Sequence, residues 1–157
     1  MSRPLTVFLP ITFDLLAPTE DVLLDDPGTW LPEASRAEPD VWRATVHLGP
    51  VSREVMCEVG PIRDEPGSLW RDLAWTPVPH AGDRIPIHQA LPSFEGEIGL
   101  HRPRAVLVLN GAYDVPGGRL GELTDALALN GAARSTATRF LADVARHAAP
   151  ASAARAG

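Results

Sequence analysis

The chain has 157 residues, of which 45% are apolar and 22% charged, and its formal net charge at pH 7 is −6. These values are typical of one globular domain with a hydrophobic core, and no apolar stretch reaches the roughly 18 residues that cross a bilayer. The sequence contains no lysine, which excludes a lysine Schiff base, a pyridoxal phosphate anchor and a P-loop. Its scattered arginines and net negative charge argue against nucleic acid and anionic membranes as partners.

The first ten residues, MSRPLTVFLP, contain only a short apolar stretch interrupted by Pro10. They lack the long apolar region and the small-residue cleavage site of a signal peptide, so the sequence predicts a cytoplasmic protein without membrane insertion. Cys57 is the single cysteine, which excludes an intramolecular disulfide and a cysteine-based zinc site.

Residues 5–16 are rich in β-branched and aromatic residues and are predicted to form the first strand. Pro10 within it predicts an edge position or a bulge, because proline cannot donate to a sheet ladder. A short helix follows, with Thr19 as its expected N-cap. The next segment, residues 33–40, is predicted to be a polar loop.

An alternation of apolar and polar residues then predicts four strands, at 41–49, 52–60, 69–78 and 91–100. Tight turns separate several of these runs, which is typical of an antiparallel meander with one buried and one wet face. The residues predicted to face inward are Trp42, Ala44, Val46, Leu48, Val55, Cys57, Val59, Leu69, Leu73, Trp75, Phe94, Gly96, Ile98 and Leu100.

Asn110-Gly111 is a strong hairpin signal when it lies between apolar runs. A turn here would leave only a short polar return strand before Pro116, whereas the alternation runs without interruption from Leu107 to Tyr113. We therefore predict one strand over residues 105–113. Gly111 is then a strand glycine over which another part of the chain packs closely.

From residue 118 to about 148 the chain is rich in Ala and Leu and has no proline, which predicts one helix of roughly 30 residues. Its apolar residues recur at helical spacing, so we expect this helix to lie along the apolar face of the sheet. Residues 149–157 are predicted to be a disordered tail.

The C-terminal third carries the most specific pattern in the chain, LVLNGAYDVPGGRLGELTDALALNGAARSTATRFLADVA. An alternating strand leads to Gly-x-Tyr, then to Pro-Gly-Gly and Leu-Gly, and finally to a long helix bearing Phe-Leu near its end. Upstream, LAWTPV and LPSFEGEIGL add a Trp-bearing strand and a Phe-x-Gly strand. With these motifs the chain resembles the START-related (SRPBCC) superfamily, which includes polyketide cyclase/dehydrase-like and lipid transport proteins.

The resemblance implies an α+β helix-grip fold over residues 1–148, in which a curved antiparallel sheet of about six strands grips the C-terminal helix. It also implies a cavity between sheet and helix that holds a lipophilic or amphipathic small molecule. Small inward residues such as Ala44, Cys57, Gly96, Gly111 and Gly131 are expected to leave this volume unfilled. The residues expected to line the cavity are Val55, Cys57, Arg71, Leu73, Trp75, Phe94, Ile98, Leu107, Leu109, Tyr113, Leu123, Leu127, Asn130 and Phe140.

Three polar residues on the predicted inner surface have alternative interpretations. Tyr113 could hydrogen-bond a ligand carbonyl or a backbone carbonyl. Arg71 shares a face with Leu73 in the expected register, where it would need a carboxylate or ligand partner, whereas a one-residue slip or a bulge would place it in water. Asn130 could contact a ligand or satisfy a helix kink at Asn130-Gly131.

No constellation typical of catalysis or metal binding is found in the sequence. His80 and His88 are eight residues apart in a proline-rich stretch, a spacing that matches no metal-ligand motif. Glu95 and Glu97 are predicted to face solvent, and Cys57 to be a small buried apolar residue. We therefore expect neither catalytic residues nor a cofactor.

The first function hypothesis is a non-enzymatic binding protein, a monomer or homodimer, that takes a lipophilic molecule into the sheet–helix cavity. The second is an enzyme of the polyketide aromatase/cyclase type, in which Tyr113 and Arg71 would promote ring closure in the same cavity. The third is a protein-interaction module whose cavity is filled by its own side chains, with Met56 and Trp70 exposed on a binding surface.

Overall fold

The structure is a computed structural model that describes residues 2–79, 92–114 and 124–156. Its strands are β1 (Ser2–Pro10), β2 (Ser35–Glu38), β3 (Val41–Leu48), β4 (Val51–Glu65), β5 (Ser68–Pro77), β6 (Phe94–His101) and β7 (Val106–Asp114). Its helices are the 3₁₀ turns η1 (Phe13–Leu15) and η2 (Pro27–Thr29), and the α-helices α1 (Leu16–Leu24) and α3 (Thr124–Ala156).

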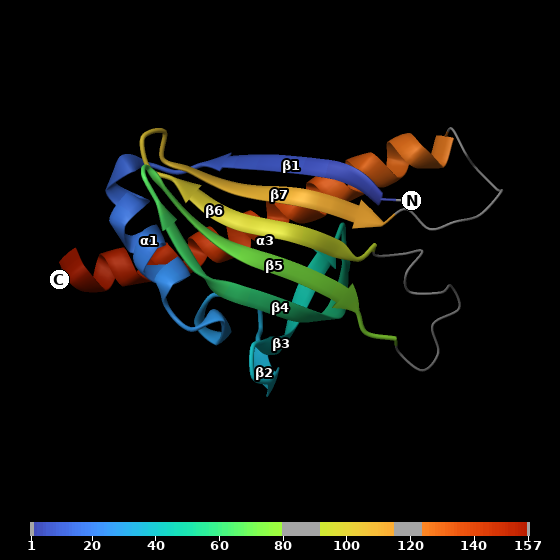
Figure 1. Cartoon of the computed structure of the whole chain (residues 1–157), viewed down its shortest axis with the longest axis horizontal. Coiled ribbons are helices and arrows are strands. Elements are labelled where there is room, and N and C mark those ends of the chain that lie inside the picture. The colour runs from blue at the N-terminus through green and yellow to red at the C-terminus, as the bar shows by residue number, and fades with distance from the viewer. Residues whose placement is uncertain (1, 80–91, 115–123, 157) are drawn as a thin grey trace.

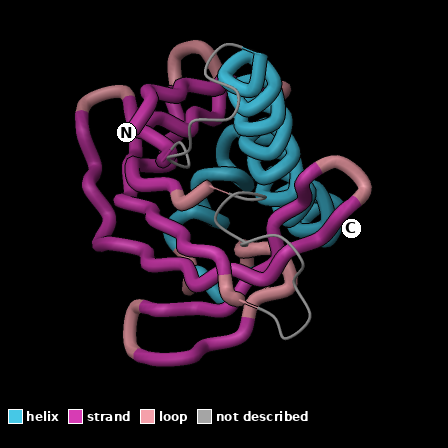
Figure 2. Tube along the Cα trace, turned by 90° about the vertical axis from the view of Figure 1, so that its right-hand side faces the viewer, coloured by secondary structure: helices cyan, strands magenta, loops and turns pink. Residues whose placement is uncertain are grey.

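The described strands form one antiparallel sheet in the order β1-β7-β6-β5-β4-β3-β2. The long helix α3 runs behind the sheet in Figure 1, and α1 packs near its C-terminal half. Viewed from the end in Figure 2, the strands bend around one side of α3. The expectation of an α+β fold with an antiparallel sheet and a C-terminal helix is confirmed, and the sheet has seven strands where about six were predicted.

The extra strand is β2, which lies in the stretch predicted to be a loop. Arg36 pairs with Trp42 of β3, and its guanidinium lies over the Trp42 ring at 5.5 Å from the ring centroid. All four β2 residues are exposed, so their composition carries no apolar alternation. The strand therefore exists through pairing with β3, which a local sequence pattern does not reveal.

The helix boundaries also differ from the prediction. Thr19 is not an N-cap, because η1 leads directly into α1 at Leu16 and Thr19 lies buried inside the helix. At the other end, α3 continues to Ala156 although the sequence predicted that it ends near residue 148. The Ala-rich composition of this last segment has high helix propensity, which outweighs the single Pro150.

The sheet face against α3 is the one that the alternation predicted. All the residues assigned to it from β3 to β6 are buried except the half-buried Leu48 and Gly96. On α3 the buried residues recur at helical spacing, from Ala133 to Ala148, and the large side chain among them is Phe140. Hydrophobic burial between the sheet and α3 is therefore the main source of stability of the described core.

Asn110-Gly111 lies inside β7, as predicted, and forms no hairpin. Gly111 pairs with Gly96 of β6, and a Cβ added at Gly111 would lie 2.6 Å from Gly96 Cα and 2.9 Å from Phe94 Cζ. The sequence predicted that another part of the chain packs closely over this glycine, and the side chain that lies there is the ring of Phe94. The space that a side chain at either glycine would need is thus taken by the neighbouring strand and by Phe94.

β1 lies at one edge of the sheet, so the edge position that Pro10 predicted is confirmed. The Ile11 N–H donates to the Ala105 carbonyl. In the observed register the backbone N–H and C=O groups of the odd-numbered β1 residues therefore point to β7, and those of the even-numbered residues point to the open edge. Pro4 and Pro10 therefore present no N–H at the open edge, and the Thr6 carbonyl accepts a hydrogen bond from Arg134 of α3. These features protect the edge from pairing with another strand.

Candidate functional site

A small cavity lies between the sheet and α3. It has a volume of about 20 Å³ and is lined by Leu5, Leu48, Trp75, Pro92, Phe94, Tyr113, Ala133 and Thr136. These residues come from β1, the end of β3, β5, β6, β7 and α3, with Pro92 just before β6. The cavity therefore exists only when the sheet closes on the helix. Its volume is about that of one water molecule or one small polar group.

Aromatic side chains form one wall of this cavity. Trp75 stacks on Phe94 with 4.6 Å between ring centroids, and its other neighbour, Phe140 of α3, lies at 5.3 Å. The Trp75 indole N–H donates to the Pro92 carbonyl at 3.3 Å. Stacking and this hydrogen bond fix the orientation of Trp75, so the wall is preorganised.

Two residues that bear a hydroxyl group line the cavity, Tyr113 from β7 and Thr136 from α3. Tyr113, which is 2% exposed, donates its hydroxyl hydrogen to Asn130 Oδ1 at 3.4 Å. Thr136 is 3% exposed, and its Oγ1 has no hydrogen-bond partner in the described part of the chain. By contrast, the exposed Thr138 on the same helix bonds back to the Arg134 carbonyl at 2.8 Å. The Thr136 hydroxyl is therefore the polar group that this apolar site leaves unsatisfied.

Thr136 was missed in the sequence, although a signal was present. It stands three residues after Ala133 and four before Phe140, which places it on the apolar stripe of the helix. The assignment of Asn130 to the inner surface agrees with its hydrogen bond to Tyr113. Sequence analysis predicted that Asn130 contacts a ligand or satisfies a helix kink, and neither role included Tyr113 as its hydrogen-bond partner.

Of the residues expected to line a cavity, Trp75, Phe94 and Tyr113 border this one. Seven others are buried in the core without lining this cavity, and these are Val55, Cys57, Leu73, Ile98, Leu107, Leu109 and Phe140. Leu123 and the Leu127 side chain lie outside the described residues. Gly131 is exposed with open space around it, so the expectation that it faces the sheet is wrong.

Arg71 lies in the register in which it shares a face with Leu73 and Trp75, and it is half-buried. Its guanidinium donates to the carbonyls of Leu23, Asp25 and Gly60 at 3.0–3.1 Å. Burial lowers its pKa, and the negative charges of Asp26 and Asp40 partly oppose this. Its partners are thus backbone carbonyls at the end of α1 and in β4. This is neither the carboxylate or ligand partner of the inward alternative nor the solvent-exposed position of the other.

Arg71 and Tyr113 do not belong to one site. Arg71 pairs with Ile98 of β6, whereas Tyr113 pairs with Phe94 of the same strand. Four residues along a strand correspond to about 13 Å, and the Arg71 side chain is directed to α1. The structure therefore does not bring together the two polar groups on which the cyclase hypothesis depends.

The remaining candidate groups lie apart from the cavity. Cys57 is fully buried, and burial raises the pKa of its thiol to about 12, so it is not a nucleophile near neutral pH. In the described residues no three His, Cys, Asp or Glu side chains are grouped so that they could hold a metal ion. His80 and His88 lie outside the described residues.

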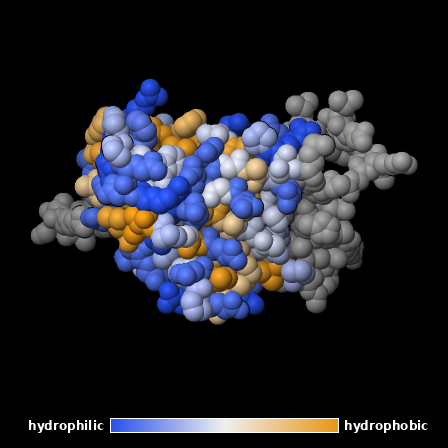
Figure 3. Space-filling view, in the orientation of Figure 1, coloured by the Kyte–Doolittle hydropathy of each residue, from blue (hydrophilic) through white to orange (hydrophobic). Residues whose placement is uncertain are grey.

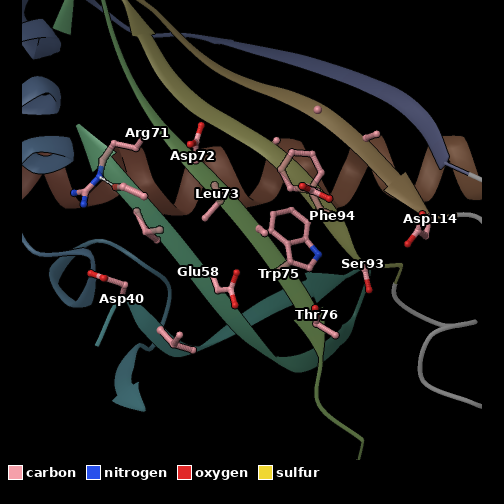
Figure 4. A pocket seen from close by; sticks show the side chains of 18 of the residues that line it. Asp40, Glu58, Arg71, Asp72, Leu73, Trp75, Thr76, Ser93, Phe94 and Asp114 are labelled. Atoms are coloured by element: carbon pink, nitrogen blue, oxygen red, sulfur yellow. Dashed lines mark hydrogen bonds between the residues drawn. The ribbon is translucent and has the colours of Figure 1, made fainter. Parts of the chain in front are cut away.

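The opposite face of the sheet carries a broad, open hollow of about 1540 Å³. Its floor includes Ala74 and Ala112, and cross-strand pairing places Glu58 and Glu95 on either side of Ala74. Asp72 and Asp114 also border it, as Figure 4 shows. Figure 3 views this side of the molecule, where hydrophilic residues cover much of the sheet. The hollow is therefore polar, acidic and wet.

A polar ladder crosses the sheet beside this hollow. Arg63 pairs with Asp72 at 3.0 Å and with Glu97 at 2.7 Å, and the hydrogen bond to Glu97 raises the Arg63 pKa. Asn110 donates to Glu97, and Thr6 donates to Asn110. Side chains of β4, β5, β6, β7 and β1 are thereby linked, which holds the wet face of the sheet in register.

No family model, curated protein or solved structure matches this chain. Among the helices of the described residues, none is long and apolar enough to cross a membrane. In the described residues, the candidate functional surfaces are the cavity beside α3 and the acidic hollow.

Proposed function

We propose that this protein is a helix-grip binding protein that holds a small amphipathic molecule at the cavity between the sheet and α3, without catalysing a reaction. The observation that carries the proposal is the Thr136 hydroxyl, which is buried among apolar side chains and has no partner in the described residues. The START-related resemblance supports the same location.

An unsatisfied hydroxyl in an apolar site costs roughly 1–3 kcal/mol, because the group has lost its hydrogen bonds to water. Valine has nearly the same shape as threonine and would remove this cost. A threonine at position 136 therefore has an advantage over valine only if its hydroxyl forms a hydrogen bond in the functional state of the protein. A bound molecule with a polar group supplies such a partner.

The cavity volume limits how the molecule binds. Only a small polar group fits beside Thr136 and Tyr113 in about 20 Å³. Leu48 is the lining residue that is only half-buried, so the apolar remainder of the molecule extends past this side chain. The arrangement suits a molecule with one small polar end and an apolar body.

Native mass spectrometry of the purified protein tests the proposal directly. We expect an additional mass that is lost on unfolding, and a lower occupancy of this adduct in Thr136→Val. Thr138→Val is the matched control, because its hydroxyl is already bonded to the Arg134 carbonyl, and it should keep the adduct. A protein without adduct, whose melting temperature also does not rise with added amphipathic molecules, would contradict the proposal.

A second candidate function is that of a protein-interaction module that docks a basic segment on the acidic hollow. The observation in its favour is that the described interior is nearly filled, whereas the hollow is large and its Glu58 and Glu95 have no ion-pair partner in the described residues. The cyclase hypothesis has no comparable support, since Arg71 and Tyr113 lie apart.

An arginine-rich peptide tests this second function by amide chemical-shift mapping. Shifts centred on Ala74 and Ala112, which weaken with salt, would support it. The double variant Glu58→Gln/Glu95→Gln should reduce the affinity more than Asp14→Asn/Glu33→Gln, which removes the same charge from exposed positions outside the hollow. Equal losses in the two double variants would show attraction by net charge alone.

A further inference from the structure

We infer that the bound molecule is recognised through a neutral hydroxyl group, and is thus an alcohol or a phenol. This rests on the proposed function and names the ligand class for the cavity beside Thr136. Three features of the described cavity lead to it: its lack of charge, the direction of its hydrogen bonds and its size.

The first feature is that the described residues lining the cavity include no Asp, Glu, His, Lys or Arg. A carboxylate or an ammonium group entering the cavity would lose its hydration without meeting an opposite charge, which is strongly unfavourable. Fatty acids and amines are therefore poor ligands for this cavity.

The second feature is how the two hydroxyl groups are used. Tyr113 donates its only O–H to Asn130, so its oxygen can still accept a hydrogen bond but not donate one. Thr136 Oγ1 is uncommitted in the described residues and can donate or accept. The matching group donates to Tyr113 and accepts from Thr136. A hydroxyl does both, whereas a ketone, ester or ether oxygen only accepts.

The third feature is the volume of about 20 Å³, which admits one oxygen atom with its hydrogen. A water molecule has the same size and the same hydrogen-bonding capacity. The test must therefore separate a ligand hydroxyl from a structural water that only satisfies Thr136 and Tyr113.

Three probes of equal chain length make this separation: 1-octanol, 2-octanone and octanoate. Binding to the full chain is followed through the amide signals of Tyr113 and Thr136. We expect 1-octanol to bind at least tenfold more tightly than the other two. Thr136→Val should lower the affinity for 1-octanol by about tenfold and raise the melting temperature of the free protein. Thr136→Ser keeps the hydroxyl and should therefore retain the preference for 1-octanol over the other two probes.

Each contrary outcome points to a different failure. Equal affinities for the three probes, unchanged in Thr136→Val, would refute hydroxyl recognition but leave a lipophilic binding site in place. If Thr136→Val lowers the melting temperature and no probe shifts the amide signals of Tyr113 and Thr136, the cavity holds only a structural water. That outcome overturns the inference. If the purified protein in addition carries no adduct, the proposed function fails as well.

Discussion

An alanine at position 111 would place its methyl carbon 2.6 Å from Gly96 Cα and 2.9 Å from Phe94 Cζ, and nearer still to the carbonyl oxygen of Glu95. Ordinary contacts of a Cβ atom begin at about 3.4 Å. Two of these neighbours are backbone atoms of β6, so they cannot rotate away as a side chain does. Relief requires β6 and β7 to separate by nearly 1 Å, which weakens their ladder.

We therefore expect Gly111→Ala to lower the free energy of unfolding by about 3 kcal/mol or more, at or above the upper end of the usual cost of overpacking. Gly99→Ala is an informative intermediate, since its Cβ would lie 2.6 Å from Cδ2 of the Trp70 ring and nearer still to Cε3 and Cζ3. Trp70 is only half-buried and can turn outward, so the expected loss is about 1–2 kcal/mol.

Gly131→Ala in α3 is the matched control. A Cβ there meets no atom within 4 Å, and alanine is the better helix former, so this variant should gain about 0.5–1 kcal/mol. Urea unfolding followed by tryptophan fluorescence measures all three variants with wild type. The reasoning is refuted if Gly111→Ala lies within 1 kcal/mol of wild type with an unchanged slope, or if Gly131→Ala is as damaging as Gly111→Ala.

Three further predictions concern single side chains. Arg71→Met should cost about 2 kcal/mol, because three carbonyls lose a charged donor, and a urea midpoint equal to that of wild type would disprove this role. The stability of wild type relative to Cys57→Ala should be constant below pH 9 and then fall by about 1.4 kcal/mol per pH unit. The reason is that the unfolded thiol ionises near pH 9 whereas burial raises the pKa of the folded one to about 12; unfolding curves whose difference does not change between pH 9 and 11 would contradict it. Tyr113→Phe should cost only about 0.5–1 kcal/mol in urea unfolding, since the bond to Asn130 is long at 3.4 Å, and a loss above 2 kcal/mol would show that the hydroxyl has a stronger partner.

The sequence alone determined which side of strands β3 to β7 is buried. Alternation is a local property with a period of two residues, so the inward positions of β3 to β7 could be identified before their partners were known. The same local evidence rejected a turn at Asn110-Gly111, because the alternation continues through it. The long C-terminal helix was also predicted, since apolar residues at helical spacing must cover an apolar sheet face.

Only the tertiary structure decided which side chains meet across that core. The ring of Phe94 fills the space over Gly96 and Gly111, and Arg71 reaches carbonyls nearly fifty residues away. The Thr136 hydroxyl has no hydrogen-bond partner among the described residues. These features depend on contacts between residues distant in sequence or on the curvature of the sheet. A local hydrophobic period encodes neither the long-range contacts nor the curvature. Whether a face that is apolar in sequence becomes a closed core or a binding cavity is decided by that packing.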